Sequence, residues 1–137
     1  MSNQIPVEGL LIRSSYEPYN KKGYYAVMDL STNKLAFPVE YFNEVQASDN
    51  AICLLAIHRV VRFCVENNLG NKIYTANMTS LAWARNAKFN SKDSEASIHR
   101  LAYANASIVA DNGYVDKILI WQQRWGSPKD WMHHLIH

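Results

Sequence analysis

The sequence predicts an α/β protein whose mixed five-stranded sheet, with its first three strands antiparallel and its last two parallel, is flanked by helices. Three apolar runs joined by turn-rich segments open the chain, which is typical of an antiparallel meander. Later apolar runs alternate with stretches whose apolar residues recur every three or four positions, which favours parallel strands added through crossover helices. The 137 residues are 48% hydrophobic and 19% charged, as expected for a single domain that spans residues 1–137 and buries a core.

The antiparallel strands are expected over residues 7–14, 24–30 and 35–42. Segment 17–23 contains proline, asparagine and glycine and is expected to form a loop, and segment 31–34 is expected to form a tight hairpin connection. Pro38 has no backbone N–H to give to a ladder, so it places the third strand at a sheet edge or at a bulge.

A long helix is expected to follow these strands. Ser48 or Asp49 suits its first turn, because either side chain accepts from free backbone N–H groups there. Apolar residues form one stripe from Leu54 to Val65, and Gly70 is expected to end the helix in a left-handed conformation. The remaining elements are expected in this order: a strand over 72–75, a helix over 78–86, a polar linker over 88–92, a helix from Asp93 or Ser94 to Asn112 and Gly113, a strand over 117–121, and a short helix opened by Pro128.

Net charge, cysteine spacing and hydropathy bear on the possible partners and the location of the protein. A formal net charge of +2 is too small to indicate a nucleic-acid partner and does not exclude one. Cys53 and Cys64 are eleven residues apart, which is roughly 16 Å along a helix axis, whereas a disulfide needs Cα atoms within about 7 Å. No apolar run approaches the ~20 residues of a membrane span, and no secretory signal is visible. We therefore expect reduced thiols, a cytoplasmic location and no membrane partner.

Four segments match motifs of one known family in their order and spacing. Residues 73–77 are similar to a strand end written IYTDS, and residues 49–50 precede the long helix as a pair of asparagines does in that family. Residues 27–34 are similar to its second hairpin, and residues 118–130 to its C-terminal segment. Over residues 10–130 the chain therefore resembles the ribonuclease H family, in a branch common among gut bacteria.

The resemblance implies a ribonuclease H-like fold and cleavage of the RNA strand of an RNA–DNA hybrid. Four carboxylates in that family hold two magnesium ions, which activate a water and stabilise the leaving oxygen. The four matching positions are occupied here by Arg13, Cys53, Ala76 and Asp130. Three of the four acids are therefore absent, and a register shift of one residue does not restore them, because the adjacent residues are not acids either.

These substitutions disfavour magnesium in three ways. Ala76 supplies no ligand, and a Cys53 thiolate is a soft ligand that suits zinc or copper better. Arg13 places a positive charge near the expected metal, and a unit-charge pair at ~4 Å and a dielectric of ~20 is worth roughly 4 kcal/mol. We therefore expect no metal and no other cofactor, with Asp130 as the one retained catalytic acid. An ion pair between Arg13 and Asp130 is a hypothesis for what replaces the metal bridge.

The resemblance also implies a groove for nucleic acid. Asn50 matches a family position that contacts the minor groove of the hybrid, and Asn77 follows the third acid position. Trp83 and Arg85 lie on the helix whose aromatic and polar residues line the groove for the DNA strand, and Lys88 adds a phosphate partner. For Trp83, packing in the core is an equally supported interpretation.

The cysteine and histidine side chains are the remaining candidates for catalytic groups. Cys53 is a candidate nucleophile whose pKa Arg13 would lower, but no histidine is convincingly placed as its base, so a buried thiol is favoured. His58 and His99 lie on predicted helices, where a surface or boundary position is favoured over a catalytic one.

Two functions stay open at this point. The first is a non-catalytic ribonuclease H-like domain that binds an RNA–DNA hybrid, another nucleic acid, or a protein partner such as a second copy of itself. The second is a weak or atypical ribonuclease H acting on RNA–DNA hybrids, with magnesium held by Asp130 and displaced acids such as Asp29, Glu40 or Asp49. The absence of three acids favours the first, although resemblance of fold does not decide function, which depends on the site.

Overall fold

The computed structural model describes residues 4–86 and 107–136. Its strands are β1 (Leu10–Glu17), β2 (Lys22–Asp29), β3 (Lys34–Leu35), β4 (Glu40–Asn43), β5 (Ile73–Thr75) and β6 (Ile118–Ile120). Its helices are α1 (Asp49–Glu66), α2 (Met78–Asn86), α4 (Ile108–Asp111) and α5 (Pro128–Trp131), with short 3₁₀ helices over Val115–Lys117 and Gln123–Trp125.

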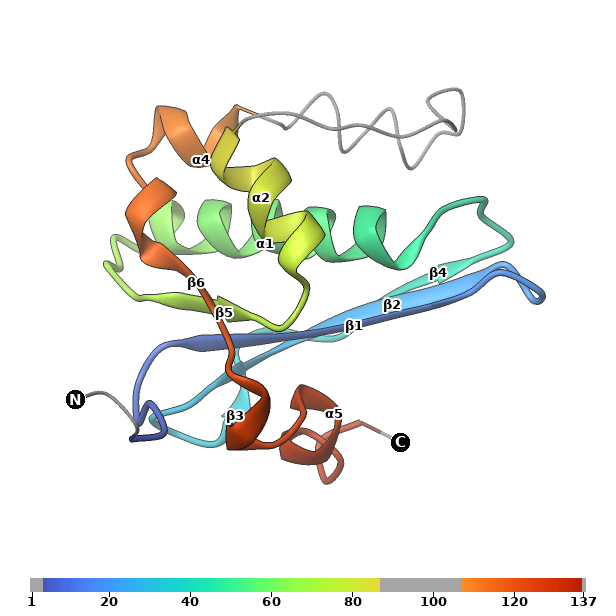
Figure 1. Ribbon diagram of the computed structural model, residues 1–137, viewed down its shortest axis with the longest axis horizontal. Coiled ribbons are helices and arrows are strands. Elements are labelled where there is room, and N and C mark those ends of the chain that lie inside the picture. The colour runs from blue at the N-terminus through green and yellow to red at the C-terminus, as the bar shows by residue number, and fades with distance from the viewer. Residues whose placement is uncertain (1–3, 87–106, 137) are drawn as a thin grey trace.

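The described strands form one mixed sheet with helices on both sides (Figure 1). The strand order is β3-β2-β1-β5-β6, and β4 also pairs with β2. Figure 1 shows α1, α2 and α4 over one face of the sheet and α5 on the other. The predicted α/β class and mixed sheet are therefore confirmed, with six strands in place of five.

The antiparallel part is longer and more divided than the sequence predicts. β1 and β2 pair from Leu10 opposite Asp29 to Glu17 opposite Lys22, which extends both strands into the predicted loop. The predicted third strand is split into β3 and β4, which both pair with β2. Pro38 lies in the interruption, as expected for a residue that cannot donate to a ladder.

The parallel part consists of β1, β5 and β6. β1 pairs in parallel with β5 through Leu10 and Leu11, and β5 pairs in parallel with β6. β5 ends at Thr75, whereas β1 continues to Glu17 on the arm that it shares with β2. Beyond the end of β5, one edge of β1 has no neighbouring strand among those described, and a groove opens there.

Polar side chains define both ends of α1. Ser48 caps the helix, its Oγ accepting from a backbone N–H of the first turn at 3.1 Å. At the other end Asn68 takes the left-handed conformation, with φ of 56°, so the predicted cap at Gly70 is wrong. Asparagine tolerates this conformation through its short polar side chain, and the chain turns two residues earlier. Cys53 and Cys64 are buried and unpaired, as their spacing predicts.

Side chains alternate between the two faces of the sheet and form two cores. On the helix face, Leu10 and Ile12 of β1 pack against α1. On the other face, the Trp121 ring meets those of Trp125 and Trp131 edge to face, with ring centroids 4.9 and 5.5 Å apart. This tryptophan cluster fastens the C-terminal segment and α5 to the sheet, because edge-to-face aromatic pairs add to the burial of their area.

The last predicted helices are described in part. Outside the described residues lie Lys88, Asp93, Ser94 and His99. α4 ends at Asn112 and Gly113, as predicted, with Gly113 at a φ of 72°. Pro128 opens α5, also as predicted, with Ser127 as its cap. Among the helices of the described ranges, none is both long and apolar enough to cross a bilayer.

Candidate functional site

The candidate site is a groove of about 540 Å³ at the carboxyl end of β5. In open α/β sheets, ligands commonly bind outside the carboxyl ends of the strands, where the loops meet. The groove is bordered by β1 and β2, by the first residues of α1, by the turn before α2, and by the start of α5. Its lining residues are Ile12, Arg13, Ser14, Ser15, Tyr24, Asp49, Thr75, Ala76, Asn77, Ser127, Pro128 and Lys129.

Arg13 is half-buried and lines this groove. Its guanidinium lies 5.3 Å from the centre of the Tyr24 ring, a cation–π arrangement that holds the side chain over β2. One terminal nitrogen donates to the carbonyl oxygen of Lys129 at 3.5 Å, which is the long limit of a hydrogen bond. Arg13 makes no ion pair with Asp130, so the hypothesis of a replacement ion pair is wrong.

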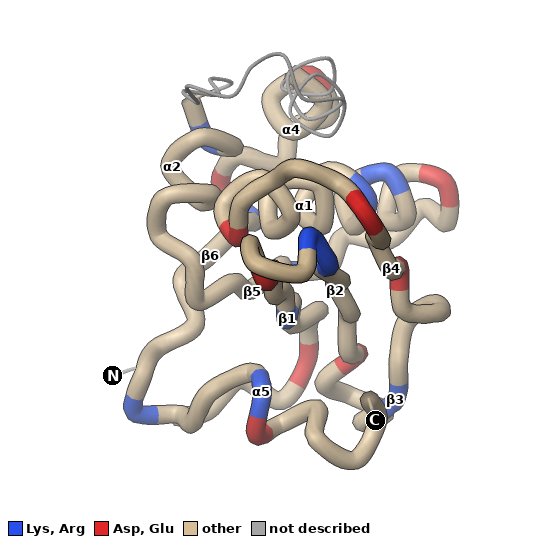
Figure 2. The backbone as a smooth tube through the Cα atoms, turned by 90° about the vertical axis from the view of Figure 1, so that its right-hand side faces the viewer, with Lys and Arg blue, Asp and Glu red and all other residues tan. Residues whose placement is uncertain are grey.

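Asp130 lines a different cavity, of about 330 Å³, together with Asn33, Gly126, Trp131 and His134. The reason is local geometry: Lys129 and Asp130 are successive residues of α5, and successive helical side chains point about 100° apart. Figure 2 shows a basic and an acidic position next to each other on α5, on the opposite side of the sheet from α1. The one acid retained at the four matched positions is therefore not a lining residue of the groove.

Cys53 lies beneath the groove and is fully buried. Its Sγ is 3.2 Å from Oγ1 of Thr75, the last residue of β5. Burial raises the pKa of the Cys53 thiol, and hydrogen bonds with Thr75, Ser14 and Ser80 oppose that rise only in part. The neutral thiol is favoured, which argues against both a thiolate nucleophile and a thiolate ligand at this position.

Asn50 and Asn77 are brought together at the edge of the groove. Asn77 Nδ2 donates to Asn50 Oδ1 at 2.9 Å, and Asn77 Oδ1 accepts from the backbone N–H of Ser80 at 2.9 Å. The Ser80 hydroxyl donates to the carbonyl oxygen of Asn50 at 2.7 Å. These bonds tie the start of α1 to the start of α2, and they leave the Asn50 amide nitrogen without a partner among the described residues.

The other predicted nucleic-acid residues lie elsewhere. Trp83 is half-buried and packs against the core on the helix face. This agrees with the core-packing interpretation of Trp83 and not with a position in the groove. Arg85 donates to the carbonyl oxygen of Ile118 at 2.7 Å and borders a separate cavity of about 690 Å³ beside β6. Neither residue lines the groove, and Lys88 lies outside the described residues.

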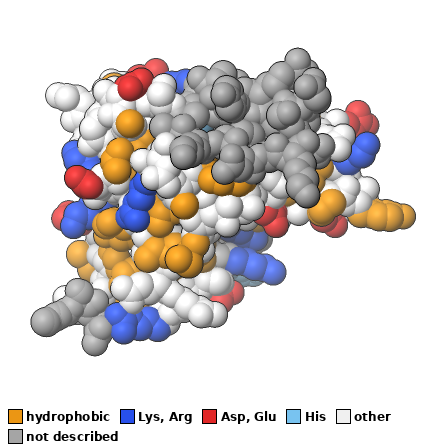
Figure 3. Space-filling model, turned by 45° about the horizontal axis from the view of Figure 1, so that its top comes forward, with side chains coloured by type: hydrophobic (Ala, Val, Ile, Leu, Met, Phe, Trp, Pro, Cys, Tyr) orange, Lys and Arg blue, Asp and Glu red, His pale blue; other side chains and the backbone are white. Residues whose placement is uncertain are grey.

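The groove collects more positive than negative charge. Arg13 and Lys129 line it, and within the described residues no carboxylate forms an ion pair with either. Asp49 is the acid among the lining residues. The starts of α1 and α2 also border the groove, and the free backbone N–H groups of a helix start carry partial positive charge. By contrast, the described side chains seen in Figure 3 mix acidic, basic and hydrophobic types without a single basic stripe.

The residues of the groove do not fit a two-magnesium centre. The four matched positions present a guanidinium, a buried thiol, a methyl group, and a carboxylate in another cavity. Among the displaced acids, Asp29 accepts from the Ser31 N–H and hydroxyl at 2.9 and 2.7 Å in a tight turn, and Glu40 lies on β4 outside the groove. Within residues 4–86 and 107–136 there is no group of three or more Asp, Glu, His or Cys arranged to hold a metal ion.

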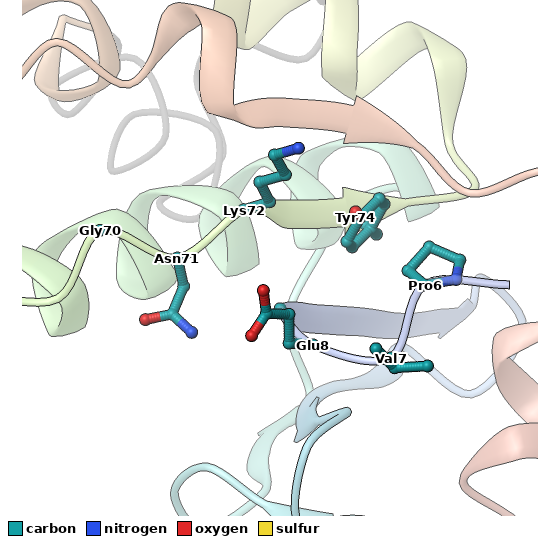
Figure 4. A pocket seen from close by; sticks show the side chains of 8 residues that line it. Pro6, Val7, Glu8, Gly70, Asn71, Lys72 and Tyr74 are labelled. Atoms are coloured by element: carbon teal, nitrogen blue, oxygen red, sulfur yellow. The ribbon is translucent and has the colours of Figure 1, made fainter. Parts of the chain in front are cut away.

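Another hollow, of about 430 Å³, lies between the segment before β1 and the loop before β5 (Figure 4). Glu8 and Lys72 are its charged lining residues, and Figure 4 shows the Lys72 ammonium pointing away from the Glu8 carboxylate. The hollow therefore does not bring two charged groups to bear on one ligand, and we regard the groove at Arg13 as the stronger candidate.

The sequence interpretation missed two residues that line the groove, Lys129 and Tyr24, and the ring of Tyr41 beside Tyr24. Lys129 adjoins the expected acid in sequence, but only the geometry of α5 shows which of the two borders the groove. Tyr24 meets Arg13 through the pairing of β1 with β2, and Tyr41 meets Tyr24 through the pairing of β2 with β4. The alternation of side chains along each strand indicates which residues share a face of the sheet. It does not indicate which residues are neighbours across strands, because that depends on the register of the pairing.

No protein-family model matches this chain, and no curated protein matches it.

Proposed function

We propose that this chain is a ribonuclease H-like domain that binds nucleic acid without cutting it, with Arg13 and Lys129 holding a backbone phosphate in the groove. One observation carries the proposal. Two basic residues line the groove where the resemblance puts the magnesium centre, and no described carboxylate pairs with either. On this proposal the side chains of Arg13 and Lys129 bind the backbone phosphate that two metal ions would bind in an active ribonuclease H.

Arg13 is well suited to this role. A guanidinium has five N–H donors in a planar fork that matches phosphate oxygens, and here one donor is engaged, in a long contact. The Tyr24 ring already restrains the side chain. Because less conformational freedom is lost when a restrained side chain binds, the contact gains affinity from this arrangement.

Neutral donors lie in the groove lining and at its edge. Ser15 and Ser127 place hydroxyl groups in the lining, and the Asn50 amide nitrogen has no partner among the described residues. Sugar and phosphate oxygens are acceptors for such groups, and contacts of this kind fix the position of a nucleic acid without reading its sequence. The sheet gives coarser support, since an antiparallel meander followed by parallel strands is what the resemblance implies.

Metal-dependent cleavage is the competing function, and the geometry does not favour it. Such a reaction needs several carboxylates around one point, and Asp49 is the acid that the groove provides. Arg13 would also repel a divalent cation placed beside it. We therefore expect no hydrolysis of an RNA–DNA hybrid with magnesium or manganese.

The binding test is a fluorescence anisotropy titration of a labelled RNA–DNA hybrid at several potassium chloride concentrations. Arg13→Gln is expected to weaken binding about tenfold and to lower the salt slope by about one, because one phosphate contact is removed. Lys129→Gln is expected to act in the same direction. Lys72→Gln removes the same charge from the other hollow and is the matched control, with binding unchanged.

Three results would contradict the proposal. A flat salt response or no binding would exclude a phosphate contact and favour a protein partner. Equal losses in Arg13→Gln and Lys72→Gln would show non-specific attraction. Robust cleavage of the hybrid with magnesium, abolished by Asp130→Asn or Asp49→Asn, would establish the nuclease instead.

A further inference from the structure

A second feature extends from the groove across the sheet. On the face opposite α1, Arg13 of β1, Tyr24 of β2 and Tyr41 of β4 lie next to one another. The Arg13 guanidinium is 5.3 Å from the Tyr24 ring centre, and the Tyr24 and Tyr41 rings are 6.1 Å apart at 44°. We call these three residues the tyrosine row. Tyr24 and Tyr41 are direct cross-strand partners, so the β2–β4 register holds their rings together.

The C-terminal segment covers only part of this sheet face. It packs where Leu11, Ala26 and Met28 meet the tryptophan cluster. Figure 1 shows α5 under the part of β1 and β2 nearer β3, while their far ends and β4 extend beyond it. Tyr41 is 58% exposed there, and Tyr24 is half-buried. The row therefore presents aromatic surface continuous with the proposed phosphate site.

Its charge favours a polyanion as the occupant. Arg13 and Lys129 lie at the groove end, and on β2 the exposed Lys22 lies opposite Glu17 of β1. The nearest strand acid on β1, Glu17, accepts a hydrogen bond from Asn20 at 3.2 Å in the hairpin. Tyrosine and arginine are also common in protein interfaces, but adjoining cations and flat aromatic rings are the features that bind unpaired nucleotides.

We propose that the tyrosine row is a base-stacking platform for single-stranded nucleic acid whose phosphate lies at Arg13 and Lys129. The inference rests on the proposed function and names its ligand class. In a hybrid duplex each base is already stacked on its neighbours, so exposed tyrosine rings add little. An unpaired base offers a free aromatic face that can stack on a protein aromatic ring.

The test compares a labelled single strand of about 12 nucleotides with a hybrid duplex of the same length, by fluorescence anisotropy. Tyr41→Ala is expected to weaken binding of the single strand at least about fivefold and to leave hybrid binding unchanged. Tyr41→Phe keeps the ring and is expected to bind as the wild type does. Tyr19→Ala is the matched control, because Tyr19 is 95% exposed and lies in the β1–β2 turn outside the row. Thermal melts of each variant verify that it is folded.

The outcomes separate this inference from the proposed function. If Tyr41→Ala binds the single strand as tightly as the wild type, while Arg13→Gln still weakens salt-sensitive binding, the platform is refuted and the phosphate site stands. If no nucleic acid binds at low salt, the proposed function is refuted and the platform with it. If light scattering shows a dimer that Tyr41→Ala dissociates, and nucleic acid does not bind, the row is an interface between copies of this chain.

Discussion

His58 is a buried titratable group that neither proposal uses, and it makes stability depend on pH. The side chain lies in the middle of α1 and is 2% exposed. Both of its ring nitrogens are buried without a hydrogen-bond partner in the described part of the chain. Burial lowers the pKa of His58 from 6.5 to about 4, with a smaller contribution from the positive charge of Arg62. A surface or boundary position was predicted for this residue, and that prediction is wrong.

The size of the effect follows from the two pKa values. The unfolded chain takes up the His58 proton near pH 6.5 and the folded chain near pH 4, a difference of about 2.5 units. One unit corresponds to 1.36 kcal/mol, so the full effect is about 3 kcal/mol. Because the folded-state pKa is the lower one, the unfolded state binds more protons between these values. The contribution of neutral His58 is complete above about pH 6.5 and declines as the pH falls towards 4.

The assay is urea unfolding at several pH values between about 7.5 and about 4.5, on wild type and His58→Leu. The wild type is expected to lose about 2–3 kcal/mol more than the variant over this range. At neutral pH His58→Leu is expected to equal or exceed the wild type in stability, because unpartnered buried polar atoms are removed. Carboxylates titrate in both proteins and cancel in the difference. Equal losses in the two proteins would refute the idea that His58 is held neutral in the fold.

Three further predictions test the fold around the site. Ser48→Ala removes the α1 cap and is expected to lower the free energy of unfolding by about 1 kcal/mol in urea, whereas Ser48→Asp, which can still cap, should retain most of it. The buried Cys53 and Cys64 thiols, whose pKa values are raised, should resist a thiol reagent such as DTNB until urea unfolds the chain; fast labelling of the native protein would contradict their burial. Gly23→Ala is expected to cost about 1–3 kcal/mol because its Cβ would lie 2.8 Å from the Ser15 carbonyl oxygen, whereas Gly70→Ala, whose nearest neighbour is the flexible Lys117 ammonium at 3.5 Å, should change stability by less than about 0.5 kcal/mol.

The sequence predicts the fold well where local chemistry decides it. Ser48 and Pro128 mark helix starts because capping and a fixed proline φ are local properties. Pro38 interrupts the edge strand for an equally local reason. Sequence reasoning fails where pairing between segments decides. β1 extends to Glu17 because β2 supplies pairing partners as far as Lys22. Residues 15–17 taken alone do not predict that the strand continues through them.

The same division holds at the candidate site. Arg13, Ala76 and Asn77 meet at the groove because Arg13 lies on β1 just beyond its pairing with β5, and Ala76 and Asn77 directly follow β5. Asp130 was expected there and borders another cavity instead, because a rotation of about 100° per residue along α5 decides between it and Lys129. The tyrosine row was invisible because Tyr24 and Tyr41 are far apart in sequence, and only the register of two strands joins them.

On the proposed assignment, the residues at positions 13, 53 and 76 all remove the repulsion that carboxylates would cause in a groove without metal ions. Carboxylates crowded around metal ions repel one another, and the positive charge of the metals offsets that repulsion. Without metals, an ionised glutamate at the fully buried position of Cys53 would carry a desolvation cost of several kcal/mol, which a neutral thiol beside Thr75 avoids. Arg13 then supplies positive charge in the groove, in place of the positive charge of the metal ions. On this proposal the groove attracts a phosphate without holding a metal-bound water that could attack it, so binding is separated from cleavage.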